Sequence, residues 1–193
     1  MTKERKFSIS SGKKWLAGLR SLYETRLSIA KLLFSFLCLL WLTLQILAPL
    51  TLKQNSANFG ESGRVGIRDN EKYYKDFNPI AKFIYCSGDA LCHQKASRSL
   101  FINGNQLSYC ARCTGIFLGI FLGSCIGIFI VVELKWYWIL IGLLPMGIDG
   151  SGQLFNLWES SNLIRLFTGI AAGLIAGLAV CMILQELTLK RKP

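Results

Sequence analysis

Residues 115–132 read GIFLGIFLGSCIGIFIVV, eighteen residues without a charged side chain. A run of this length and apolarity is typical of a helix that crosses a bilayer, because about 20 helical residues span the hydrocarbon core. Glycine recurs every fourth position along it, which places the glycines on one side of a helix. Small residues in such a ladder let another helix approach closely. This run therefore predicts a membrane helix that packs through its glycines.

Three further apolar runs predict three more membrane helices, at 32–52, 136–148 and 163–187. The run at 136–148 is short and is interrupted by Pro145 and Gly147. About four transmembrane helices make the chain an all-α integral membrane protein. We expect the helix at 32–52 to be an uncleaved anchor, because no clear small-residue cleavage site follows it.

The run at 163–187 repeats the ladder, with Gly169, Gly173 and Gly177 four residues apart. It and the run at 115–132 are predicted to cross in the same direction, so the two ladders can pair along their whole length. We expect that pairing within one chain. The alternatives are that each ladder packs on some other helix or mediates a helix–helix oligomer.

The charge distribution predicts the topology. The net charge is +11, and residues 1–31 alone carry eight basic and two acidic side chains. A second basic stretch closes the chain at 188–193. Basic segments that flank membrane helices favour the cytoplasmic side, and an even number of spans puts both termini there. We therefore expect a multi-pass cell (inner) membrane protein whose partner is the lipid bilayer, and no nucleic-acid binding.

The predicted organisation has five parts. Residues 1–31 form a basic cytoplasmic segment with an amphipathic helix at 13–30. The other parts are a transmembrane helix at 32–52, an extracytoplasmic Cys/His loop at 53–113, a three-transmembrane-helix region at 114–187, and a basic cytoplasmic tail at 188–193.

The loop at 53–113 has a predicted structure of its own. Residues 70–85 have a helical pattern, and residues 100–102 and 106–109 resemble short strands around Asn103-Gly104. Asn-Gly between extended runs is a strong hairpin signal. A segment this small needs a staple to hold a core.

Cysteines supply two possible staples. Cys92, His93, Cys110 and Cys113 provide three thiolates and one imidazole, a common zinc set, so we expect a metal site, with Cys86 as a substitute ligand. The alternative is disulfides, Cys86 with Cys92 and Cys110 with Cys113. The remaining cysteines, Cys38, Cys125 and Cys181, fall inside predicted spans and are interpreted as small apolar fillers.

A redox role is the second functional hypothesis. Cys110-Ala-Arg-Cys113 opens a membrane helix, and a helix N-terminus and Arg112 both lower a thiol pKa. That layout resembles the membrane thiol oxidases that pass electrons to quinone. A c-type haem is disfavoured, because Thr114 stands where histidine would follow the CxxC.

Polar residues are predicted to converge at the loop ends of the last two spans and to line a pocket. The candidate ligand-binding residues are Gln94, Arg98, Arg112, Asp149, Gln153, Glu159, Asn162 and Arg165. Arg165 needs a partner in this setting, and Asp149 or Glu159 is the obvious one. The set suits an anionic lipid or small solute. The third hypothesis is an enzyme or transporter in which Asp149 or Glu159 is the general base. The other candidate catalytic residues are the thiols Cys110 and Cys113.

One sequence pattern resembles a family of small predicted membrane proteins of bacteria and archaea, a domain of unknown function. The resemblance lies in Cys92-His93-Gln94, Arg98-Ser99, Cys110-Ala-Arg-Cys-Thr-Gly115, Asp149-Gly150 with Gln153, Glu159-Ser160, Asn162, Arg165 and Gly169. It covers about residues 75–180 and implies no activity. Because Cys86 is outside this pattern, the resemblance favours Cys92, His93, Cys110 and Cys113 as the zinc ligands.

Overall fold

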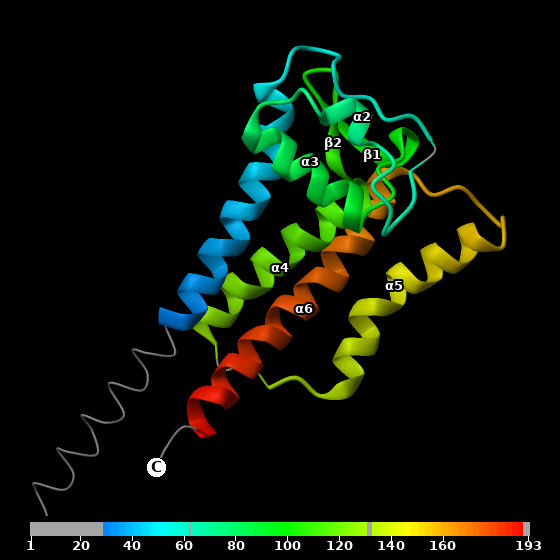
Figure 1. The fold of residues 1–193 in the computed structure, drawn as a ribbon. Coiled ribbons are helices and arrows are strands. Elements are labelled where there is room, and N and C mark those ends of the chain that lie inside the picture. The colour runs from blue at the N-terminus through cyan, green and yellow to red at the C-terminus, as the bar shows by residue number, and fades with distance from the viewer. Residues whose placement is uncertain (1–28, 62, 131–132, 191–193) are drawn as a thin grey trace, which may run out of the picture.

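The computed structural model describes residues 29–61, 63–130 and 133–190, and most of the predicted amphipathic helix at 13–30 lies outside them (Figure 1). The described part is mostly helical. Its first helix is the N-terminal span, Ile29–Thr51, which ends in η1 (Ala48–Thr51). The later elements are α2 (Glu71–Tyr74), α3 (Pro79–Leu91), η2 (Ala96–Arg98), β1 (Ser99–Ile102), β2 (Asn105–Cys110), α4 (Ala111–Phe129), α5 (Trp136–Leu154) and α6 (Asn162–Lys190).

Three of these helices are long and apolar enough to cross a membrane: Ile29–Thr51, Ala111–Phe129 and Asn162–Leu187. They match the predicted runs at 32–52, 115–132 and 163–187. The predicted run at 136–148 is also a helix, but α5 falls short of the same apolar standard. It continues through Pro145 to Leu154, and so includes polar residues that the prediction had left outside it.

The two glycine ladders pack against each other, as predicted. An added Cβ at a ladder glycine would collide with the backbone of the facing helix. In α4 the collisions are Gly115 with Leu166, Gly119 with Ile170 and Gly123 with Leu174; in α6 they are Gly169 with Arg112, Gly173 with Ile116 and Gly177 with Ile120. Contacts that advance in step along both helices show that α4 and α6 run parallel. Since these glycines are used within the chain, they are covered by α6 and α4 rather than exposed for an oligomer.

Because α4 and α6 are parallel, the chain between them must return along the bundle. The helix that returns it is α5, which follows the loop after α4 and runs back towards the end of the bundle where α6 begins (Figure 1). It packs on α6, where Gly142 faces the side chain of Ile175. Its other faces leave large apolar side chains exposed, including Leu140 and Leu144.

Residues 53–110 fold into a cap on one end of the bundle, which we call the hairpin layer. Its β1 and β2 pair antiparallel, with Ile102 opposite Asn105. Asn103 and Gly104 both have positive φ, 54° and 71°, the conformation of a two-residue hairpin turn. The end of the molecule that carries this layer is the hairpin end.

The predicted helix at 70–85 is two helices in the structure. Asn78 interrupts it, since its side chain accepts a hydrogen bond from the Ala81 amide at 2.9 Å and Pro79 occupies the first turn of α3. An Asn cap followed by Pro is a strong start signal for a new helix.

The hairpin layer has an apolar core after all. Phe59, Tyr74, Ile84 and Tyr85 are completely or almost completely buried, and Trp41 of the N-terminal span packs against them. The prediction that a segment this small needs a staple overlooked the apolar surface that the N-terminal span contributes.

Buried amides complete the hairpin layer. Gln106 is fully buried, accepts a hydrogen bond from the Phe59 amide at 3.0 Å and donates one to Ser99 Oγ at 3.1 Å. Asn105 is also fully buried and donates to the backbone carbonyl of Pro49 at 2.9 Å. These bonds tie the hairpin to the segment that enters it from the first span.

Candidate functional site

Three cysteines from three local structures meet at the hairpin end, and we call them the thiol cluster. Cys92 is the C-cap of α3, Cys110 is the last residue of β2 and the N-cap of α4, and Cys113 lies in the first turn of α4. Their Sγ atoms all lie within 4.8 Å of one another. The hairpin returns the chain from Cys92 to Cys110, and one helical turn brings Cys113 alongside.

The thiol cluster is enclosed by aromatic side chains. Cys92 is 2% exposed and Cys110 8% exposed, and both pack with Tyr109. Trp41 and Phe117 cover the cluster from the membrane side. Water therefore has little access to the Cys92 and Cys110 side chains, whereas Cys113 is half-buried.

Cys110 is the thiol most easily ionised. Its pKa is held well below the usual cysteine value because the Cys113 and Cys92 thiols donate hydrogen bonds to it. The backbone N–H groups of Cys113 and Arg112, at the start of α4, act in the same direction. The pKa of Cys92 is raised, mainly because its thiol hydrogen bonds to Cys110.

His93 and Cys86 lie apart from the cluster. Cys92 has an extended backbone, with φ −141° and ψ 154°, so consecutive side chains point in opposite directions and His93 is exposed. Cys86 packs against the apolar core of the hairpin layer. Among the described residues, Cys92, Cys110 and Cys113 are the only group of three potential metal ligands this close together.

A second polar assembly joins α4, α5 and α6 at the hairpin end, and we call it the arginine network. Arg112 forms an ion pair with Asp149. Gln153 donates to the Asp149 carboxylate at 2.9 Å, and its own carbonyl oxygen accepts a hydrogen bond from Arg165 at 3.0 Å. Arg165 also donates to Asn162 at 3.1 Å.

The network corrects the expected partner of Arg165. Asp149 forms its ion pair with Arg112, and Glu159 is exposed at the surface. Within the described residues, Arg165 is 5% exposed and is held by amide oxygens rather than by a carboxylate. The choice depends on how α5 is rotated and placed, which its periodicity does not determine.

Two residues outside the predicted set support Asp149. Ser160 and Trp158 hydrogen bond to its carboxylate. Both follow α5 in the turn that leads to α6; Ser160 belongs to the sequence pattern that resembles the family, whereas Trp158 carried no signal.

Gln94 is not part of the arginine network. It is fully buried in the hairpin layer, where its amide donates to the carbonyls of Tyr85 and Ser108 and accepts a hydrogen bond from Asn70. These hydrogen bonds connect α3, β2 and the segment before α2 within the hairpin layer.

Positive charge exceeds negative charge around Arg165. The charged side chains that act on it most strongly are Arg98, Arg112 and Asp149, together with the Cys110 thiol. In addition, the Nε atom of Arg112 is buried without a hydrogen-bond partner. The thiol cluster and the arginine network are therefore electrostatic neighbours.

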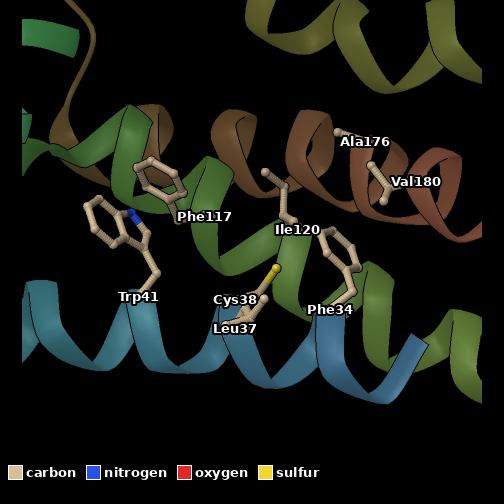
Figure 2. Close-up of a pocket in the computed structure, with 8 residues that line it drawn as sticks. All are labelled: Phe34, Leu37, Cys38, Trp41, Phe117, Ile120, Ala176 and Val180. Atoms are coloured by element: carbon tan, nitrogen blue, oxygen red, sulfur yellow. The ribbon is translucent and has the colours of Figure 1, made fainter. Parts of the chain in front are cut away.

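An apolar cavity of about 380 Å³, partly open at the surface, lies between the N-terminal span, α4 and α6. Figure 2 shows Trp41 and Phe117 at one end of it and Phe34 at the other, with Cys38 between them. Hydrocarbon chains suit such a lining, which is almost entirely apolar. Trp41 and Phe117 separate this cavity from the thiol cluster.

Known proteins share the part of the chain that holds both assemblies. Residues 92–179 match the family model described as "Predicted membrane protein (DUF2085)". The uncharacterized protein MJ1492 of Methanocaldococcus jannaschii is 38% identical over 118 residues, 58% of this chain and 75% of that protein. An uncharacterized protein of Methanothermobacter thermautotrophicus is 40% identical over 93 residues, 47% of this chain and 82% of that protein.

No solved structure matches the chain. The matched region begins at Cys92 and ends in α6, so it contains the thiol cluster, the arginine network and the α4–α6 pair. Together with the coverage of the relatives, this shows that the chain belongs to the DUF2085 family of predicted membrane proteins.

Proposed function

We propose that this membrane protein binds a thiophilic metal ion through Cys92, Cys110 and Cys113. The observation that carries the proposal is the approach of the three Sγ atoms to within 4.8 Å of one another. Thiolate sulfur is a preferred ligand of zinc and of other soft ions. Zinc is the ion with which the proposal is tested first.

A metal in this place would fasten the hairpin layer to the membrane helices. Cys92 ends α3, whereas Cys110 and Cys113 begin α4. One ion bound to all three would hold the layer beside the arginine network, whose Asn162 donates to the backbone carbonyl of Ser99 at 3.1 Å. The layer would then cap that polar assembly in a fixed position.

The proposal places the hairpin end on the extracytoplasmic side of a cell membrane. Its support is the basic character of 1–31 and 188–193, which favours the cytoplasm for both termini. It also makes α5 a fourth span. A parallel α4–α6 pair requires a return crossing, and the 19 residues of α5 are about 28 Å long, close to the thickness of a bilayer core.

Metal content of the purified protein tests the main proposal. The chain is purified in mild detergent without chelator, and bound metal per chain is measured by mass spectrometry. We expect about one ion per chain. Cys110→Ser removes a ligand and should lose the ion, whereas Cys86→Ser, whose thiol packs in the apolar core, should keep it.

The proposal fails if wild-type protein with reduced thiols binds no zinc or other thiophilic ion on reconstitution. It also fails if Cys110→Ser and Cys86→Ser bind metal equally.

Thiol–disulfide exchange is a second candidate, favoured by the lowered pKa of Cys110 at the start of α4. In this scheme the Cys110 thiolate attacks a disulfide of a partner protein, and one partner sulfur leaves and takes a proton. The Cys113 thiolate then attacks the mixed disulfide. A Cys110–Cys113 disulfide forms, so the pair is oxidised, and the partner leaves reduced to a dithiol.

Trapping distinguishes this candidate from a metal site. Cys113→Ser stops the second attack, so a mixed disulfide with the partner should accumulate and disappear on addition of reductant. Cys113→Ser in a Cys110→Ser background is the matched control and should trap nothing. If the single variant traps no partner in cells, the exchange scheme is wrong.

A further inference from the structure

The number of thiols and the surrounding charge specify the kind of metal more narrowly. Resting on the proposed function, we infer that the thiol cluster is a three-coordinate site for a soft monovalent cation, Cu(I). The arginine network supplies its counter-charge.

The first argument is the number of ligands. Zinc in structural sites is almost always bound by four ligands in a tetrahedron. Here three thiols lie within 4.8 Å of one another, and no further His, Cys, Asp or Glu of the described residues joins the group. The adjacent His93 is directed to the surface by the extended backbone at Cys92. Cu(I) is a soft ion that thiolates select, and three sulfurs complete its coordination.

The second argument is the packing of apolar side chains around the thiol cluster. A catalytic zinc site completes its coordination with water. Tyr109, Trp41 and Phe117 pack against the cluster, in which Cys92 and Cys110 are almost completely buried and Cys113 is half-buried. The apolar side chains around Cys92 and Cys110 favour an ion that needs no fourth ligand from solvent.

The third argument is charge. Three thiolates around one monovalent cation carry a net charge of minus two, and an uncompensated charge of this kind is costly away from water. The groups with the largest electrostatic effect on Arg165 are Arg98, Arg112, Asp149 and the Cys110 thiol, and three arginines against one carboxylate carry plus two. A divalent ion would leave the arginines in excess. The arrangement also explains why the buried Arg165 has no carboxylate partner among the described residues: its counter-charge is the metal–thiolate group.

Competition between the two metals tests the inference. Purified protein is reduced, stripped of metal and incubated anaerobically with Cu(I) held by a chromophoric Cu(I) chelator, and in parallel with Zn(II) held by a chromophoric Zn(II) chelator. We expect one Cu(I) per chain, taken from a chelator that outcompetes single thiols. X-ray absorption should show a first shell of three sulfur neighbours. Excess Zn(II) should fail to displace the Cu(I).

Variants test separately the role of the cysteines as metal ligands and the role of the arginines as counter-charge. Cys92→Ser should abolish tight Cu(I) binding, and Cys38→Ser, in the apolar cavity, should leave it unchanged. Arg165→Met keeps all three thiols and removes one nearby positive charge. It should weaken Cu(I) binding about tenfold or more. Arg64→Met removes an exposed arginine that pairs with Asp69 and should have no effect.

Each outcome has a distinct meaning. If the cluster binds Zn(II) but Zn(II) displaces Cu(I), the inference is overturned and the proposed metal site stands. If neither ion binds to reduced protein, both are wrong. Equal Cu(I) affinities in Arg165→Met, Arg98→Gln and wild type would overturn the counter-charge role. Phosphate binding that Arg165→Met abolishes, with unchanged Cu(I) affinity, would assign the arginines to an anionic ligand instead.

Discussion

In the hairpin layer, the side chains of Gln94, Asn105 and Gln106 are completely buried, and all three hydrogen bond to backbone groups. In the α4–α6 pair, the contact consists of glycines against backbone, with hardly any side chain between the two helices. The layer depends on matched donors and acceptors, and the pair depends on the absence of side chains. Each region should therefore fail under a different kind of substitution.

The largest effect is expected in the α4–α6 pair. Gly119→Leu inserts a side chain where a Cβ alone would collide with the backbone of Ile170, so the helices must separate. We expect a loss of about 3 kcal/mol in the free energy of unfolding, the upper end of the usual cost of overpacking. Thermal unfolding in detergent, followed by circular dichroism, measures it.

Gly147→Leu is the matched control, because a Cβ at Gly147 of α5 meets nothing within 4 Å. Equal destabilisation by the two substitutions would contradict the backbone-contact account of the pair.

A smaller effect, confined to the hairpin layer, is expected from Gln106→Leu. It keeps the volume but leaves the Phe59 amide without its acceptor and the Ser99 hydroxyl without its donor. A stranded buried polar group costs about 1–3 kcal/mol. Limited proteolysis should cut within 53–110 sooner, while the helical circular dichroism of the bundle is unchanged. Gln54→Leu, at an exposed position of the same layer, should be cut no faster than wild type.

Part of the difference between the hairpin layer and the α4–α6 pair could be predicted from the sequence, and part could not. Apolar run length predicted four spans, and three of the four helices are long and apolar enough to cross a membrane. The four-residue spacing predicted the α4–α6 pair, and Asn103-Gly104 predicted the hairpin turn. These features depend on local pattern alone.

Which side chains come together in the site depends on tertiary packing, which a local sequence pattern does not determine. Cys110 and Cys113 share a helical turn, so their proximity follows from spacing, whereas His93 was predicted as a ligand although the extended backbone at Cys92 points it away. The pairing of Arg112 with Asp149 depends on how α5 packs beside α4 and α6. The residue types predicted a polar assembly at the hairpin end, but they did not predict which side chains pair with each other.

The smallest effect is a pH dependence at the edge of the hairpin layer. The Glu61 carboxylate accepts hydrogen bonds from the side chain and backbone of Ser97, and these lower its pKa. A lowered pKa means that the contribution of Glu61 is full above the ordinary glutamate pKa and is lost as the pH falls through the lowered value. Amide exchange at 96–98 should therefore accelerate below about pH 4.5 in wild type. In Glu61→Gln that step should be absent. An identical step in both proteins would assign it to another group.

The parallel arrangement of α4 and α6 has a consequence for biosynthesis. Neighbouring helices that run antiparallel can enter a membrane together as a hairpin, but a parallel pair cannot. When α4 leaves the ribosome, the helix that covers its glycines has not yet been made, and α5 must be laid down first. The glycine face of α4 is thus exposed to lipid or to an insertion chaperone for the whole time that residues 130–161 are synthesised. Assembly of this bundle is a late event in translation, and a nascent chain that stops before Asn162 leaves α4 without its mate.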